Sequence, residues 1–139
     1  IGRVVSPGNR FEPGKKPMST MAPTIVFEKD DELFLVTGSP GGSDIPAAIL
    51  RVITGVIDFD LDIGEATMLP RIHKDWPYRG LEHERAVSRD IVRRLSSMGH
   101  EPEYENTIGS TQSIHVVDDV NYGYADLRRP NAGVSVQTN

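Results

Sequence analysis

Cysteine is absent from the 139 residues, which excludes disulfide bonds, thiol catalysis and cysteine-ligated metal centres. The sequence also lacks an apolar run of about 18 residues, so direct membrane insertion is not expected. Excess positive charge is missing as well, because the formal net charge is −5, and this disfavours nucleic acid as the principal partner. What remains is a segment with 37% hydrophobic and 25% charged residues, a composition typical of one folded domain.

The two ends of the sequence differ from its centre. Residues 1–17 contain three prolines, three glycines and four cationic side chains, which predicts a loop. Residues 127–139, "LRRPNAGVSVQTN", show no sustained periodicity and predict a loosely ordered tail. We therefore place the ordered core at residues 18–126.

The first half of the core predicts a hairpin followed by helices. Residues 24–28 and 33–37 are rich in β-branched and aromatic side chains and flank a polar turn. Apolar side chains recur at helical spacing over 45–57, after a possible N-cap at Asp44, with a single charge inside that range. This helix is expected to be buried on most sides. A short helix is predicted over 62–68.

The second half predicts one more helix and several short strands. Residues 71–85 read as irregular, with one short strand at 81–84. A helix is predicted from the N-cap Ser88 to Gly99. Strands are predicted at 101–105, 112–117 and 122–125, with 118–121 as the last turn. This order favours an α+β fold with a largely antiparallel sheet and helices on one face.

The stretch "SPGGSD" joins the second predicted strand to the long helix. Glycine lets the backbone approach a ligand closely, and the N–H groups of Gly41 and Gly42 would precede a helix N-terminus. Such N–H groups can bind a phosphate or the oxyanion of an acyl-transfer intermediate. A tight strand-to-helix turn explains the same residues, and the motif alone does not decide between the two. It is not a Walker loop, since no Gly-Lys-Ser/Thr follows.

Ser19 and Thr20 are adjacent hydroxyls in a proline-bounded loop. Paired hydroxyls can bind a substrate carboxylate by charge-assisted hydrogen bonds, although turn or capping hydroxyls are the commoner explanation. The stretch 58–62, "DFDLD", lacks the glycine and final glutamate of a calcium loop and is read as solvated helix-end acids. Arg128 and Arg129 are read as surface or interface ion pairs rather than an anion grip.

The four histidines show no tight metal-ligand spacing. A metal site built from His73, His83 and nearby carboxylates is conceivable, but scattered surface histidines are the favoured interpretation. No metal and no cofactor is therefore predicted. The histidines are His73, His83, His100 and His115.

Five ordered blocks resemble the small subunit of γ-glutamyltransferases, also called γ-glutamyl transpeptidases. The blocks are "PMSTMAPTIV", "LVTGSPGGS", "VIDFDLDIGEATMLPRIH", "GSTQSI" and "GYADLRRP", and the resemblance runs from about residue 8 to 130. It implies part of an N-terminal-nucleophile hydrolase fold, a four-layer αββα sandwich. It also implies a precursor that cleaves itself, and an N-terminal Thr that attacks the γ-glutamyl amide of glutathione and related compounds. Water or an acceptor amine then resolves the γ-glutamyl-enzyme.

The resemblance assigns roles where the motifs match. Gly41 and Gly42 match the Gly-Gly whose N–H groups form the oxyanion hole. Ser19 and Thr20 match a Ser-Ser pair that binds the substrate α-carboxylate, with Thr20 departing from serine but keeping the hydroxyl. Lys74 replaces a histidine found in many members.

No Thr-Thr-His-like start occurs in the sequence, which begins at Ile1. We therefore expect residues 1–139 to be a C-terminal segment of the small subunit, inactive by itself. Its expected partners are the large subunit, the missing N-terminal part of the small subunit and a γ-glutamyl substrate. By the same resemblance the enzyme is expected in the periplasm or outside the cell.

Two alternatives remain open. A sister acylase on the same fold, of the cephalosporin acylase or poly-γ-glutamate depolymerase type, would prefer bulky acyl or polymeric donors. A non-catalytic module would use the glycine turn only to bind an anion.

Overall fold

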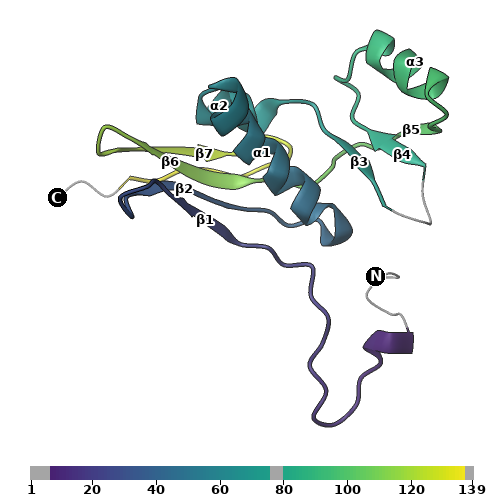
Figure 1. The fold of residues 1–139 in the computed structure, drawn as a ribbon, viewed down its shortest axis with the longest axis horizontal. Helices are drawn as coiled ribbons and strands as arrows, with labels where there is room; N and C mark the ends of the chain where they lie inside the picture. Colours follow the sequence, from purple (N-terminus) through teal and green to yellow (C-terminus); the bar gives the residue numbers. More distant parts are fainter. Residues whose placement is uncertain (1–6, 76–79, 137–139) are drawn as a thin grey trace.

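The computed structural model describes residues 7–75 and 80–136, which form two sheets and three α-helices within those ranges. One sheet is four-stranded, in the order β1-β2-β6-β7, and all its neighbours are antiparallel; the other has the order β3-β4-β5 (Figure 1). The elements are η1 Pro7–Asn9, β1 Thr24–Phe27, β2 Leu33–Gly38, η2 Gly42–Asp44, α1 Ile45–Phe59, α2 Ile63–Met68, β3 Ile72–Lys74, β4 Leu81–His83, α3 Arg89–Ser97, β5 Pro102–Tyr104, β6 Gln112–Val117 and β7 Val120–Ala125. The predicted α+β class is confirmed.

Helices α1 and α2 cover one face of the four-stranded sheet (Figure 1). Gly55 allows the two helices to pack closely, because a Cβ there would lie 2.9 Å from the Cβ of Ala66. Asp62 starts α2 with a complete capping box, in which its side chain accepts from the N–H of Glu65 at 2.8 Å. The main core lies between these helices and the sheet and consists of Leu35, Val52, Val56, Ile63 and Ala66.

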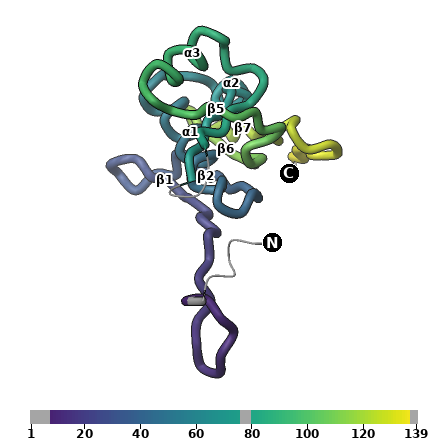
Figure 2. The backbone as a smooth tube through the Cα atoms, turned by 90° about the vertical axis from the view of Figure 1, so that its right-hand side faces the viewer, coloured from purple at the N-terminus to yellow at the C-terminus, as the bar shows by residue number. Residues whose placement is uncertain are grey.

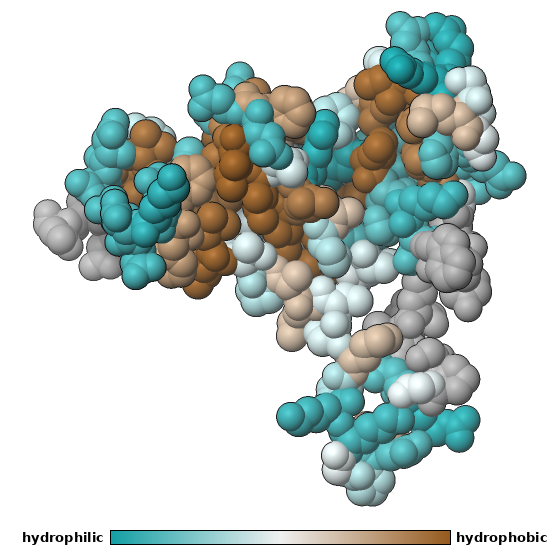
Figure 3. Space-filling view, viewed as in Figure 1, coloured by the Kyte–Doolittle hydropathy of each residue, from teal (hydrophilic) through white to brown (hydrophobic). Residues whose placement is uncertain are grey.

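The predicted burial of α1 is wrong on one side of the helix. Leu50, Ile57 and Phe59 are 60%, 51% and 65% exposed, whereas Val52 on the sheet-facing stripe is fully buried. Figure 3 shows apolar residues gathered along α1. The side chain of Asp44 makes no capping hydrogen bond, so that predicted role is also wrong. Within the described ranges no helix has the length and apolar character needed to span a bilayer.

The second sheet contains a strand that the sequence did not predict. Residues 72–74 read as irregular, yet they form β3 and pair antiparallel with β4. β4 and β5 run parallel, because α3 connects them as a crossover. Ser88 caps α3 as predicted, accepting from the N–H of Ile91 at 3.4 Å. Gly99 follows the helix with φ of 88°.

The predicted N-terminal loop is observed from residue 7 onward, with one short 3₁₀ turn, and residues 1–6 of that prediction lie outside the described ranges. This arm extends away from the sheets before it enters β1 (Figures 1 and 2). At the other end of the core, β7 begins at Val120, two residues before the predicted strand. Asp118 and Asp119 form the two-residue turn and have φ of 49° and 61°.

Candidate functional site

The glycine turn predicted from sequence lies between β2 and α1. Gly41 has φ of 146° and Gly42 has φ of 64°, conformations that favour glycine. The N–H of Asp44 donates to the carbonyl of Gly41 at 3.2 Å and closes the turn. Both glycines are exposed, and neither N–H donates a hydrogen bond within residues 7–75 and 80–136. The turn therefore presents two adjacent donors at its surface.

The loop that precedes β6 supports this turn from behind. The N–H of Ser110 donates to Ser39 Oγ at 2.9 Å, and Ser39 Oγ donates to the carbonyl of Pro40 at 2.7 Å. A Cβ on Gly41 would lie 3.2 Å from the Cα of Gly109, and a Cβ on Gly109 would lie 2.7 Å from the Cβ of Ala48. A larger residue at Gly41 would push against the Gly109 loop, and one at Gly109 would push against α1 and Ser39, so the position of the two N–H groups depends on both glycines.

Ser19 and Thr20 lie on the N-terminal arm. Ser19 is exposed, and its Oγ accepts from the N–H of Met21 at 3.1 Å, which is the turn geometry that the sequence left open. Thr20 is half-buried. In the described part of the chain no hydrogen bond connects either hydroxyl to the glycine turn. A role in substrate binding for this pair remains a prediction.

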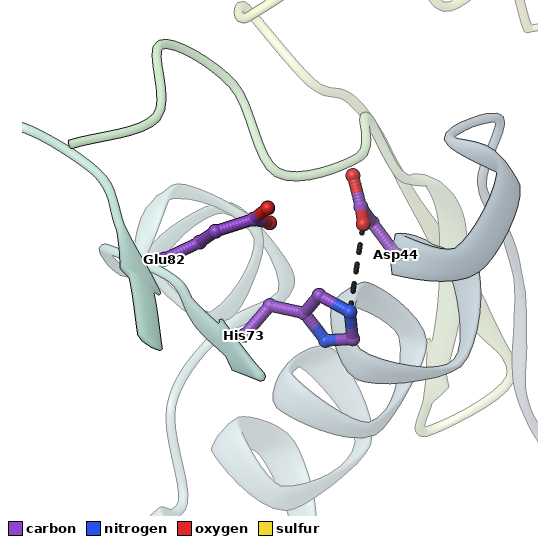
Figure 4. Close-up of side chains that lie close together, drawn as sticks. All are labelled: Asp44, His73 and Glu82. Carbon is purple, nitrogen blue, oxygen red and sulfur yellow. Dashed lines mark ion pairs between the residues drawn. The ribbon is translucent and has the colours of Figure 1, made fainter. Parts of the chain in front are cut away.

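A second cluster, formed by Asp44, His73 and Glu82, lies next to the turn. One potential ligand atom from each of the three side chains lies within 4.8 Å of the other two. Figure 4 shows the side chains pointing toward one another from η2, β3 and β4. His73 Nε2 lies 3.6 Å from Asp44 Oδ1. His73 and Glu82 are directly opposite each other across the β3–β4 pair, which places both on one face of the sheet.

Burial shapes the electrostatics of this cluster. The side chain of His73 is only 12% exposed, so the interpretation of this histidine as a surface residue is wrong. Burial raises the pKa of Asp44, the charge of His73 opposes that rise, and Glu82 adds to it. The sequence missed the cluster because its members come from three elements, and only the register of β3 on β4 brings two of them together. His83, the second histidine of the conceivable site, lies elsewhere, with its Nδ1 3.0 Å from the carbonyl oxygen of Glu84.

Buried ion pairs connect the residues that follow β7 to the residues that flank the β3–β4 pair. Arg71 donates to Asp126 Oδ2 at 2.8 Å, and these side chains are 1% and 0% exposed. Arg128 donates to Glu84 Oε2 at 2.7 Å and to Asp126 Oδ1 at 3.2 Å, with its own side chain 12% exposed. Arg128 thus forms ion pairs as predicted, but they are buried and not at the surface, and the tail is fixed at its start. Arg129 is exposed.

The profile of the family described as gamma-glutamyltranspeptidase matches residues 2–136. The glutathione hydrolase proenzyme of Escherichia coli is 41% identical over 128 residues, which cover 91% of this chain and 22% of that protein. The corresponding proenzyme of Bacillus subtilis is 35% identical over 132 residues, again covering 22% of its length. The chain thus spans about a fifth of the length of these relatives.

Solved structures that resemble this chain include members of the same family. A mutant of Helicobacter pylori γ-glutamyltranspeptidase aligns with a TM-score of 0.83 and 36% identity, over 89% of this chain and 69% of that chain. The Pseudomonas nitroreducens γ-glutamyltranspeptidase complexed with L-DON aligns with a TM-score of 0.83 and 31% identity, over 95% and 70%. A cephalosporin acylase from Bacillus halodurans, at 23% identity and a TM-score of 0.71, shares the fold.

Proposed function

The chain belongs to the γ-glutamyltranspeptidase family and has part of its N-terminal-nucleophile hydrolase fold, and on that basis we propose that it supplies part of the active site of an enzyme acting on γ-glutamyl compounds. The reaction is transfer or hydrolysis of the γ-glutamyl group of glutathione and related compounds. One observation carries this proposal: two adjacent N–H groups, of Gly41 and Gly42, lie exposed between β2 and α1 without a hydrogen-bond partner in the described ranges.

These donors would act as the oxyanion hole. A nucleophilic Thr hydroxyl, outside the residues of this chain, attacks the γ-carbonyl, and the carbonyl π electrons move onto oxygen. The two N–H groups stabilise that oxyanion more strongly than the neutral carbonyl, which lowers the barrier. The amine leaves with a proton from the terminal amino group, and water or an acceptor amine then cleaves the γ-glutamyl ester. The chain by itself is inactive in this scheme.

Ser19 and Thr20 would bind the α-carboxylate of the γ-glutamyl group through their hydroxyls. Ser19 Oγ already accepts one hydrogen bond from Met21, which leaves its own hydrogen available to a substrate oxygen. The arm that carries both residues is exposed over most of its length, so a further part of the protein would have to position it against the glycine turn.

The surfaces that would bind the remaining parts of the enzyme are formed by exposed apolar side chains. Leu50 and Ile57 form a second stripe on α1, and Ile25 and Ile114, which are 58% and 43% exposed, lie in one cross-strand row on the sheet face away from the helices. Burial of these side chains would stabilise an assembly with the remainder of the small subunit and the large subunit. No cofactor is required by this chemistry. Location in the periplasm or outside the cell follows only from the family resemblance.

The test uses the full-length, processed enzyme and γ-glutamyl-p-nitroanilide. Gly42→Ala adds a Cβ that meets no atom within 4 Å but forces a left-handed alanine, at a strain of about 1–2 kcal/mol. Gly99→Ala is a matched control, because Gly99 also has positive φ and open space, after α3. Loss of an oxyanion donor lowers kcat by about 10²–10³. Since alanine displaces the donor without removing it, we expect a fall of at least about tenfold.

Equal kcat for the Gly42→Ala and Gly99→Ala enzymes would contradict the oxyanion role. Complete lack of turnover by correctly cleaved wild-type enzyme would instead favour a non-catalytic anion-binding module. The sister acylase is tested with the same preparation. Preference for a cephalosporin side chain or poly-γ-glutamate over glutathione would support it, whereas a rise in KM for free γ-glutamyl donors in the Ser19→Ala enzyme supports the carboxylate role.

A further inference from the structure

The Asp44, His73 and Glu82 cluster brings one imidazole and two carboxylates together from η2, β3 and β4 (Figure 4). We propose that these three side chains form a binding site for a divalent transition-metal ion such as Zn²⁺. Imidazole nitrogen together with carboxylate oxygen is a ligand set that Zn²⁺ accepts, usually with water in the remaining position. The proposal does not depend on the γ-glutamyl chemistry.

The distances fit a site that closes around an ion. Two ligands bonded to Zn²⁺ at about 2.0–2.1 Å in tetrahedral geometry lie about 3.3 Å apart. His73 Nε2 and Asp44 Oδ1 are separated by 3.6 Å, so this pair is already near that spacing. The three ligand atoms lie within 4.8 Å of one another, so an ion bound between them would draw the Glu82 carboxylate closer to the other two ligands.

The backbone holds the three metal-binding residues in place. His73 and Glu82 are cross-strand partners, which fixes both side chains on one face, and Asp44 is fixed by the hydrogen bond from its N–H to Gly41. A metal site gains affinity when little movement is needed to assemble it. Because each ligand comes from a separate element, the bound ion would connect the second sheet to the start of α1.

Burial supplies a second, independent observation. His73 Nε2 is a buried atom with no hydrogen-bond partner in the described part of the chain, and it points into the cluster. A buried nitrogen of this kind is costly unless something binds to it. Glu82 is 3% exposed, so two of the three ligands lie in an environment where water competes weakly for an ion. The positive end of α1 disfavours a cation, and the two carboxylates offset it.

The location gives the ion a consequence that rests on the proposed function. Asp44 is two residues after Gly42, and its N–H closes the glycine turn. An ion bound by Asp44 would restrain that turn from the side of β3 and β4. Metal binding is measured without turnover, so the metal site can fail or succeed whatever the outcome for the oxyanion hole.

The experiment uses the full-length, processed protein after dialysis against EDTA, titrated with ZnCl₂ in a calorimeter. We expect saturable binding that His73→Gln and Glu82→Gln each weaken by at least about tenfold, because even outer-shell changes at metal sites cost about 10–100-fold. His100→Gln is the matched control, since His100 lies outside the cluster. Circular dichroism establishes that each variant is folded.

Crystals of the wild-type protein soaked in ZnCl₂ provide a measurement that needs no variant. An anomalous difference peak at the zinc edge between Asp44, His73 and Glu82 would support the site. Peaks only at other places, or none, would overturn it. Zn²⁺ affinity that is unchanged in both His73→Gln and Glu82→Gln, or no saturable binding to the wild-type protein, would overturn it as well.

Discussion

Substitution of Asp126 by Asn is expected to destabilise the protein strongly. The Asp126 side chain is fully buried and accepts four hydrogen bonds. Oδ2 accepts from Arg71 Nη2 at 2.8 Å and from the N–H of Thr111 at 3.0 Å. Oδ1 accepts from the N–H of Arg128 at 2.9 Å and from its Nη1 at 3.2 Å. An asparagine side chain keeps one acceptor oxygen, but its NH₂ group would face the N–H donors that now bind the second carboxylate oxygen.

The size of the stability loss depends on which buried groups lose their charged partner. Removing one partner of a buried ion pair costs about 3–5 kcal/mol. Arg128 keeps Glu84 as a partner, but the Nη2 of Arg71 retains only neutral acceptors, among them the carbonyl of Thr67 at 3.0 Å. We therefore expect a loss near the lower end, about 3 kcal/mol in the free energy of unfolding.

The assay is thermal unfolding of the processed full-length protein at neutral pH. A unit of about 150–250 residues loses about 2–4 °C per kcal/mol and a larger one loses less, so the midpoint should fall by some degrees and clearly below that of the control. Asp90→Asn is the matched control, because Asp90 makes an ion pair with Arg93 but its side chain is 83% exposed. Exposed pairs contribute little, and the control should leave the midpoint unchanged. An Asp126→Asn protein as stable as the control would refute the reasoning.

The pH dependence provides a second check on the same variant. Burial by itself would raise the pKa of Asp126, but the N–H of Arg128, the charge of Arg71 and the N–H of Thr111 outweigh burial and lower it. A carboxyl whose folded pKa is lowered contributes stability above its unfolded pKa, about 3.9, and loses it as the pH falls through the folded pKa. The difference in midpoint between wild type and Asp126→Asn should therefore shrink as the pH falls below about 4.

Three further predictions concern α1 and α2. Burial raises the pKa of Asp44, so the ionised carboxylate opposes folding at a pH above that pKa. Asp44→Asn in metal-free buffer should therefore raise the thermal midpoint more at pH 7 than at pH 4. A lower midpoint than wild type at both pH values would contradict this. Gly55→Ala should destabilise the protein by about 1–3 kcal/mol despite the better helix propensity of alanine, because the new Cβ would lie 2.9 Å from the Cβ of Ala66. The second substitution Ala66→Gly should restore the urea midpoint. Asp62→Ala removes the capping box of α2 and should lower the free energy of unfolding by about 1 kcal/mol, whereas Asp62→Asn should retain most of it.

The elements that the sequence predicted are those whose signal is local. The α1 stripe, the Asp62 start of α2 and the Ser88 cap of α3 each depend on neighbours within one or two turns. The predictions that failed depend on distant partners, except for the Asp44 cap, which is local. β3 has only three residues and exists because β4 pairs with it. The exposed side of α1 looked buried because its side chains are apolar, and an exposed apolar stripe has the same sequence pattern as a core-facing one.

The same division explains which parts of the candidate site were visible in the sequence. Gly41 and Gly42 indicate a turn by their residue type alone, since few other residues adopt the positive φ found there. His73 gives no local signal, because its partners are 29 residues earlier at Asp44 and 9 later at Glu82 (73 − 44 and 82 − 73). Only the pairing of His73 opposite Glu82 places both on the face near Asp44, and a one-residue slip of β3 would turn His73 to the other face. The proposed metal site and the glycine turn thus share Asp44 but depend on different interactions: the turn on its own backbone and the Gly109 loop, the cluster on the register of β3 and β4.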